Sequence, residues 1–208
     1  MARKADPNKR KTILQAAARV FARKGYAATR IIEVADAAKV GKGTIYQYFP
    51  SKEELLFCVF EAVVAATGEA MTQTAQHLEG SFSKRLRRLS DSMMESWLEQ
   101  LEFYALTMEF WSASASMPSR ERFKTVFRDG YRRLRSAVKD LIVDAQAAGD
   151  VSPGVNAHDI ASAMIGTWDA LLLQAWLDPD FDALRVSRQF MDVMLRGLDS
   201  AEKTPEPN

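Results

Sequence analysis

The sequence predicts an all-α protein of about nine helices. Apolar residues recur at intervals of three and four along most of the chain, whereas hardly any segment shows the period of two that marks a strand. Glycine, proline and capping residues separate the periodic stretches, as they do at helix ends. Hydrophobic residues make up 47% of the 208 residues and aromatic residues 10%, so the chain can form a substantial core.

The first predicted helix starts at Asp6-Pro7, where a capping side chain precedes a first-turn proline, and it ends at Gly25. The residues before it include Arg3 and Lys4, part of a short basic tail suited to contacts with phosphate or with a minor groove. The inward stripe of this helix is Ile13, Leu14, Ala17, Val20 and Phe21.

Two short amphipathic segments flank a four-residue turn between residues 29 and 49, and Thr29 is expected to cap the start of the first segment. Because the apolar residues of each segment fall on one helical face, the other residues of the second segment are turned outward. The pattern predicts a helix-turn-helix with a free outward face. The inward positions are Ile31, Val34, Ala35 and Ala38 in the first segment and Ile45 and Phe49 in the second.

The turn and the start of the second segment read Lys39-Val40-Gly41-Lys42-Gly43. A helix N-terminus offers unpaired N–H groups and a partial positive charge, and glycine lets a ligand approach the backbone closely. This stretch therefore predicts contact with a polyanion.

Charge is distributed unevenly along the chain. Residues 1–60 contain 12 Lys/Arg against 5 Asp/Glu, a net charge of +7, although the whole chain carries only +1. The other 148 residues therefore carry −6. Such a run can be an ordinary solvated face, but together with the helix-turn-helix pattern it indicates a nucleic-acid-binding N-terminal region.

The order GKGTIYQYFPSKEEL at residues 41–55 resembles the DNA-binding signature of the TetR/AcrR family of bacterial regulators, and the match runs from Ile13 to about Leu56. One departure is Lys39, where members often carry glycine. The resemblance implies a homodimeric repressor that a ligand releases from a palindromic operator. We expect a three-helix helix-turn-helix DNA-binding domain in residues 1–50. A C-terminal helical domain for ligand binding and dimerisation is expected in residues 51–200, and a disordered tail in residues 201–208.

Gln47 is the best candidate for reading a base, because an outward amide can pair bidentately with adenine in the major groove. Thr44 is placed to contact a thymine methyl group, and Gly43 allows close approach. The remaining candidates are assigned to phosphates; the less favoured alternative is that Thr29 only caps the helix and the two tyrosines only pack the small domain. These residues are Thr29, Arg30, Lys42, Tyr46, Tyr48 and Lys52.

After Pro50, Ser51 and Glu54 predict a capping box that opens a long helix running toward Gly80. In the family this helix connects the DNA-reading helices to the ligand-binding region, a role that the resemblance implies here. Further helices are expected at residues 81–100, 101–115, 119–148, 156–177 and 181–198.

The C-terminal part contains many large, adaptable side chains, which are typical of a pocket for an apolar or aromatic molecule. A filled core is the alternative reading of the same pattern. Glu109 and Asp169 lie among apolar neighbours, where a carboxylate needs a partner such as a cationic ligand, an arginine or water. The candidate pocket residues are Met93, Trp97, Tyr104, Met108, Trp111, Phe127, Tyr131, Met164 and Trp168.

The last two predicted helices carry more apolar surface than one core needs, which predicts an association surface. Pairing them across a two-fold axis makes a four-helix interface, and the resulting dimer presents two recognition helices to a palindromic site. The candidate interface residues are Leu172, Trp176, Phe190, Met194 and Leu198.

Catalytic, metal and membrane functions have little support. Cys58, His77 and His158 cannot form a catalytic arrangement or a zinc site at ordinary spacings, and we expect neither cofactor nor metal. No apolar run or leader pattern is evident, so we expect a cytoplasmic protein that is not an enzyme. Two alternatives stay open: an activator or ligand-independent regulator of the same fold, and a helical small-molecule-binding protein without specific DNA binding.

Overall fold

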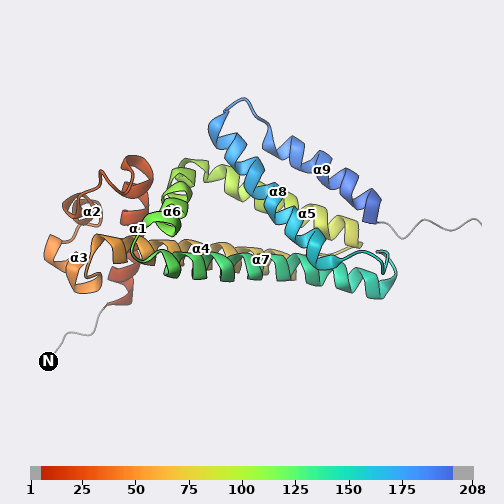
Figure 1. Cartoon of the computed structure of the whole chain (residues 1–208), viewed down its shortest axis with the longest axis horizontal. Helices are drawn as coiled ribbons and strands as arrows, with labels where there is room; N and C mark the ends of the chain where they lie inside the picture. Colours follow the sequence, from red (N-terminus) through yellow and green to blue (C-terminus); the bar gives the residue numbers. More distant parts are fainter. Residues whose placement is uncertain (1–5, 199–208) are drawn as a thin grey trace, which may run out of the picture. The chain divides into compact units, whose positions relative to one another are not determined.

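The computed structural model describes residues 6–198, which contain nine α-helices, one short 3-10 helix and no strand. The all-α prediction is therefore confirmed. The predicted contacts of Arg3 and Lys4 and the predicted tail at residues 201–208 lie outside the described residues. The helices are α1 (Pro7–Lys24), α2 (Ile31–Ala37), α3 (Lys42–Tyr48), α4 (Lys52–Gln76), α5 (Phe82–Glu99), η1 (Leu101–Phe103), α6 (Tyr104–Ser116), α7 (Arg120–Ala148), α8 (Ala157–Leu177) and α9 (Ala183–Leu198) (Figure 1).

The described residues form two compact units. The first unit takes the chain up to Thr67 together with Glu102–Arg128, and the second takes Gly68–Leu101 together with the chain from Asp129 onward. Helices α4 and α7 thus contribute to both units. This division by packing does not follow the domain boundary expected after residue 50, and the assignment of functions to residues 1–50 and 51–200 stays a prediction.

Local sequence signals account for α1. The carboxylate of Asp6 accepts hydrogen bonds from the backbone N–H groups of Asn8, at 2.9 Å, and Lys9, at 3.4 Å. Gly25 ends the helix with a φ of 77°, a conformation that glycine adopts without the steric cost other residues meet. The apolar stripe expected for this helix is buried.

An aromatic cluster joins α4, α6 and the start of α7 within the first unit. The ring centroid of Phe60 lies 4.7 Å from that of Phe110, 5.3 Å from that of Phe123 and 4.5 Å from that of Phe127. These rings belong to the same apolar core as the inward residues of α1, α2 and α3. The helix-turn-helix is therefore packed on helices that follow it in the sequence, including α6 and the start of α7.

The start of α4 confirms only half of the predicted capping box. The hydroxyl of Ser51 accepts a 3.0 Å hydrogen bond from the Glu54 backbone N–H, as expected. The Glu54 carboxylate does not reach back to the cap; it accepts two hydrogen bonds from the Arg122 guanidinium, at 2.7 and 3.0 Å. A bidentate arginine was the stronger competitor for this carboxylate. Helix α4 also ends earlier than expected, at Gln76.

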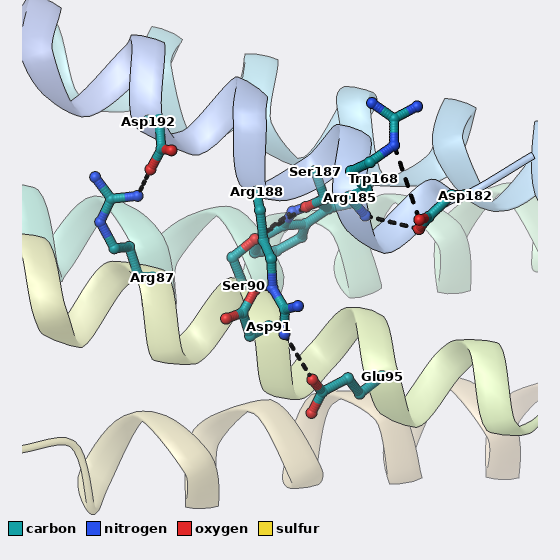
Figure 2. A network of polar contacts seen from close by, with 10 residues as sticks. All are labelled: Arg87, Ser90, Asp91, Glu95, Trp168, Asp182, Arg185, Ser187, Arg188 and Asp192. Atoms are coloured by element: carbon teal, nitrogen blue, oxygen red, sulfur yellow. Dashed lines mark hydrogen bonds and ion pairs between the residues drawn. The ribbon is translucent and has the colours of Figure 1, made fainter.

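In the second unit, α5, α8 and α9 lie side by side (Figure 1). The indole Nε1–H of Trp168 donates a 3.2 Å hydrogen bond to the hydroxyl of Ser90, which lies 3.3 Å from the hydroxyl of Ser187. Figure 2 shows this buried chain of polar groups linking the three helices. Because each of these three buried groups has a partner, Trp168, Ser90 and Ser187 avoid the cost of unsatisfied burial.

Exposed ion pairs join α5 to α9 around the buried chain (Figure 2). The Arg188 guanidinium lies 3.1 Å from an oxygen of Asp91 and 3.0 Å from an oxygen of Glu95, and Arg87 pairs with Asp192. Exposed pairs each contribute only about 0–1 kcal/mol. They therefore help to fix the alignment of the two helices more than they stabilise the core.

Two of the described helices, α4 and α8, are long and apolar enough to cross a membrane by length and composition alone. This is weak evidence for a span, because the core helix of a soluble protein passes the same test.

Candidate nucleic-acid interface

The inward positions expected for the helix-turn-helix are buried. Ile31, Val34 and Ala35 of α2 and Ile45 of α3 each expose 7% or less of their surface, and Phe49, directly after α3, exposes 1%. These side chains fix the two helices against each other and against α1. The opposite side of α3 is consequently the outward face that the sequence predicted.

The outward face of α3 is formed by residues without an evident structural role. Lys42, Gly43 and Gln47 are exposed, Tyr46 exposes 45% of its surface, and Thr44 is half-buried. A Cβ atom added at Gly43 would meet nothing within 4 Å. The fold therefore does not require glycine at this position.

Lys39 adopts the left-handed conformation, with a φ of 55°, in the turn between α2 and α3. Its backbone N–H donates a 3.1 Å hydrogen bond to the carbonyl of Asp36, which closes the turn. A side chain in this conformation costs about 1–2 kcal/mol. The conformation of Lys39 in this turn therefore lowers the stability of the fold relative to glycine at the same position.

Tyr48 has an intramolecular partner. Tyr48 is half-buried, and its hydroxyl accepts a 2.9 Å hydrogen bond from the backbone N–H of Asp6, the residue that caps α1. The ring lies beside that of Phe49, with 6.3 Å between centroids. Tyr48 therefore ties the end of α3 to the start of α1, which is the packing role that the sequence left open.

The prediction that Thr29 caps α2 is wrong. Thr29 is 2% exposed, and its hydroxyl donates a 2.7 Å hydrogen bond to the carbonyl of Gly25. The cap position of α2 is Arg30, whose backbone N–H donates to the Glu33 carboxylate at 2.8 Å. The buried Thr29 hydroxyl, already donating within the chain, is poorly placed for a phosphate, whereas the Arg30 side chain is 77% exposed.

The structure also gives Lys52 a role other than the expected phosphate contact. Its ammonium group donates to the carbonyls of Tyr26, at 2.8 Å, and Thr29, at 3.0 Å, and lies 3.4 Å from that of Ala27. It also lies 4.3 Å from the centroid of the Tyr26 ring. A cation with three hydrogen-bond donors suits a cluster of carbonyls. Lys52 therefore fixes the connection between α1 and α2.

The nine expected pocket residues are divided between the units, five in the second and four in the first. Met93, Met164 and Trp168 are buried in the core of α5, α8 and α9, and Trp97 packs edge-on against Trp168 at 5.8 Å. Phe127 belongs to the aromatic cluster, Trp111 is 37% exposed, and Tyr104, Met108 and Tyr131 are half-buried. The pocket stays a prediction.

Asp169 on α8 is half-buried, and its hydrogen-bond partner is Tyr131 on α7. The Tyr131 hydroxyl donates a 2.6 Å hydrogen bond to Oδ2 of Asp169. Burial raises the pKa of the Asp169 carboxyl, and the Tyr131 hydrogen bond opposes part of that rise. Within residues 6–198 Asp169 has no ion-pair partner, so the internal arginine considered from the sequence is not supplied there.

One cavity of about 190 Å³ lies in the second unit, lined by Ser81, Phe82, Ser83, Gly149, Asp150, Leu195 and Leu198. None of the expected pocket residues lines it.

Two family models match most of the chain. Residues 13–59 match bacterial regulatory proteins of the tetR family, and residues 83–199 match the C-terminal part of BetI-type transcriptional repressors. The second match alone covers more than half of the sequence. The chain belongs to the TetR family. It is therefore a DNA-binding transcriptional regulator and not an enzyme.

Relatives of this TetR-family regulator span nearly all of it. The transcriptional repressor KstR of Mycolicibacterium smegmatis is 28% identical over 212 residues, which cover 97% of this chain and 92% of the repressor. A Saccharomonospora viridis regulator solved in complex with choline superposes with a TM-score of 0.75, at 21% identity, over 92% of this chain and 97% of that one. FadR from Bacillus subtilis, solved in complex with stearoyl-CoA, superposes with a TM-score of 0.73, at 19% identity, over 90% of this chain and 98% of that one.

The expected association residues of the TetR-family regulator are not equally accessible. Leu172 and Leu198 are buried, Phe190 and Met194 are half-buried, and Trp176 is 38% exposed. Other exposed apolar residues of these helices are Gly166 and Leu177 on α8 and Val193 and Gly197 on α9. A Cβ atom added at either glycine would meet nothing within 4 Å. The apolar stripe of α9 in the sequence already contains Val193 and Gly197, whereas Gly166 and Leu177 were not expected on this surface.

Proposed function

We propose that this TetR-family regulator is a homodimeric repressor that binds an approximately palindromic operator and leaves it when a small molecule binds. The observation that carries the DNA-binding part is the outward face of α3. It presents an amide, a lysine and a tyrosine beside a glycine that the fold does not need.

In this proposal Gln47 reads a base, Thr44 contacts a neighbouring base edge, and Gly43 allows the helix to lie close to the groove. Lys42, Tyr46 and Arg30 are exposed and are assigned to phosphates, which position the protein without reading sequence. Glycine in a helix costs about 0.5–1 kcal/mol relative to alanine. A glycine with open space around it supports close approach by an external partner at this point.

The proposed dimer pairs α8 and α9 with the same helices of a second copy. Apolar side chains of both helices are exposed, with Val193 at 56% and Leu177 at 66%. The open glycines Gly166 and Gly197 let helix backbones from the partner come close. An isologous interface of this kind places two α3 helices about a two-fold axis, which matches a palindromic site.

The proposed ligand is an apolar or aromatic molecule. Within the first unit, the half-buried side chains of Tyr104 and Met108 suit such a molecule because aromatic and methionine side chains make adaptable walls. The relatives solved with choline and with stearoyl-CoA support ligand control, although those two ligands differ widely in size and charge. A ligand that favours a DNA-incompatible conformation lowers DNA affinity by its differential affinity for the two conformations. Because the relatives named above are repressors, we favour a repressor released from DNA by its ligand over an activator. We place the regulator in the cytoplasm, where its DNA lies.

Selection of bound duplexes from a random DNA library tests this function. We expect enrichment of an inverted repeat, two protomers per selected site, and an affinity that falls steeply with salt because basic residues displace counterions. Enrichment of a single half-site would contradict the dimer. Failure to enrich any sequence would favour a helical small-molecule-binding protein without specific DNA binding.

A ligand panel then tests the release step on the selected duplex. An apolar compound that raises the melting temperature and weakens DNA binding supports ligand-released repression. A compound that strengthens DNA binding would point to a co-repressor or an activator mechanism.

A further inference from the structure

We infer that Glu109 on α6 is a positioning residue for DNA binding, because it holds the turn that leads into the helix-turn-helix. The inference rests on the proposed function and concerns how the first unit orients α2 and α3. Glu109 lies 83 residues after its partner in the sequence and outside the three DNA-reading helices.

The contact is built into the shape of the turn between α1 and α2. The backbone N–H of Tyr26 donates a 2.9 Å hydrogen bond to Oε1 of Glu109. A Cβ atom added at the neighbouring Gly25 would lie only 2.9 Å from the same oxygen. A side chain at position 25 would therefore force this carboxylate to shift from the position in which it accepts the Tyr26 hydrogen bond.

The same turn is also held by a residue of α4. The Lys52 ammonium group donates hydrogen bonds to the carbonyls of Tyr26 and Thr29, and the Thr29 hydroxyl donates to the carbonyl of Gly25. The short connection between α1 and α2 is thus bonded to a donor on α4, Lys52, and to an acceptor on α6, Glu109. Because α2 begins only two residues after Thr29, moving this connection moves the start of α2.

Helix α6 is firmly placed within the first unit. Leu106, Phe110 and Ala113 on one side of α6 are buried in the core that also holds α1. Glu109 is half-buried, and within residues 6–198 no cation pairs with it. The hydrogen bond that Glu109 accepts comes from Tyr26 in the turn, so Glu109 stabilises the segment that leads into the helix-turn-helix.

Charge and hydrogen bonding predict opposite effects on DNA binding. A carboxylate in a DNA-binding unit repels phosphates, so removing its charge should strengthen binding. Removing an acceptor that positions the turn should weaken binding. Glu109→Gln removes the charge and keeps an acceptor oxygen, whereas Glu109→Ala removes both.

The experiment measures the affinity of wild type, Glu109→Ala and Glu109→Gln for the duplex that wild type selects and for a scrambled duplex. We expect Glu109→Ala to lose roughly tenfold on the selected duplex, the effect of one hydrogen bond to a charged acceptor, and little on the scrambled one. Glu109→Gln should bind as wild type or more tightly. Glu102→Ala, at an exposed glutamate of η1, is the matched control and should bind as wild type.

Hydrogen exchange at the Tyr26 amide gives a second readout that does not depend on DNA. Exchange should be faster in Glu109→Ala than in wild type and Glu102→Ala, and thermal unfolding confirms that each variant is folded. Equal Tyr26 exchange in all variants overturns the inference, even if wild type selects no sequence and the proposed function fails separately. Undiminished operator binding by folded Glu109→Ala, or equal weakening by Glu109→Gln, overturns it as well.

Discussion

The hydroxyl of Tyr131 lies 2.6 Å from Oδ2 of Asp169 and links α7 to α8 within the second unit. Asp169 is half-buried, and a neutral donor compensates only part of the cost of burying a charged carboxylate. Burial accordingly raises the pKa of Asp169 above its ordinary value of 3.8. The folded protein therefore keeps this proton to a higher pH than the unfolded chain does.

Replacing Asp169 with asparagine should stabilise the protein at pH 7. The stability that comes from the neutral carboxyl is fully present below the unfolded pKa and is lost as the pH rises through the raised folded pKa. Asparagine keeps an acceptor for Tyr131 and never ionises. Thermal unfolding should show a higher melting temperature for Asp169→Asn at pH 7, with the advantage shrinking toward pH 4. Asp144→Asn, at an exposed aspartate of α7, is the control, and an advantage that grows at low pH would contradict the prediction.

Replacing Lys39 with glycine should raise the free energy of unfolding by roughly 0.5–1 kcal/mol. Glycine relieves the left-handed strain but costs some additional chain entropy, so the gain is smaller than the strain itself. Lys39→Ala separates the two causes, because it removes the charge and keeps the strain. The free energy of unfolding of each variant is measured by chemical denaturation. If Lys39→Ala is stabilised as much as Lys39→Gly, the loss of charge and not the backbone conformation is responsible.

Replacing Gly43 with alanine should separate folding from DNA binding. Alanine favours the helix by about 0.5–1 kcal/mol, and the added methyl group meets nothing in the chain. We expect an unchanged or higher melting temperature together with weaker binding to the selected duplex. Retained affinity in titrations would mean that the DNA does not approach α3 at this position.

Replacing Gln47 with alanine should relax the preference at one base position of each half-site, at a cost of about 1–3 kcal/mol on the preferred sequence. Affinity is measured on duplexes that carry each base at that position. Lys42→Ala is the comparison, since loss of a phosphate contact weakens all duplexes alike. Uniform weakening by Gln47→Ala would reassign this residue to the DNA backbone.

Replacing Val193 with glutamate should produce a folded monomer. Val193 is exposed in the single chain, so the charge costs little until a second copy covers it. Sedimentation analysis should show dissociation, and affinity for the inverted repeat should fall because one half-site is lost. Val143→Glu on α7, at another exposed valine (43% against 56% for Val193), is the control and should remain dimeric. Dissociation by both variants would place the association surface elsewhere.

The sequence by itself determined the helices and the orientation of the helix-turn-helix. Asp6-Pro7 starts α1 and Gly25 ends it, through contacts with residues two to four positions away. The spacing of Ile45 and Phe49 turns Gln47 outward. These signals are local, because a cap or an apolar stripe depends on the identity of near neighbours. They could therefore be read without knowing the fold.

Only the tertiary structure decided which partner each polar side chain takes. Lys52 reaches a carbonyl 26 residues away, Tyr131 a carboxylate 38 residues away, and Glu109 an amide 83 residues away. Residue type alone made Lys52 a reasonable phosphate ligand. Its position beside the carbonyls of the connection between α1 and α2 gave it other acceptors, because a polar group binds the partner that the surrounding elements bring within hydrogen-bonding distance.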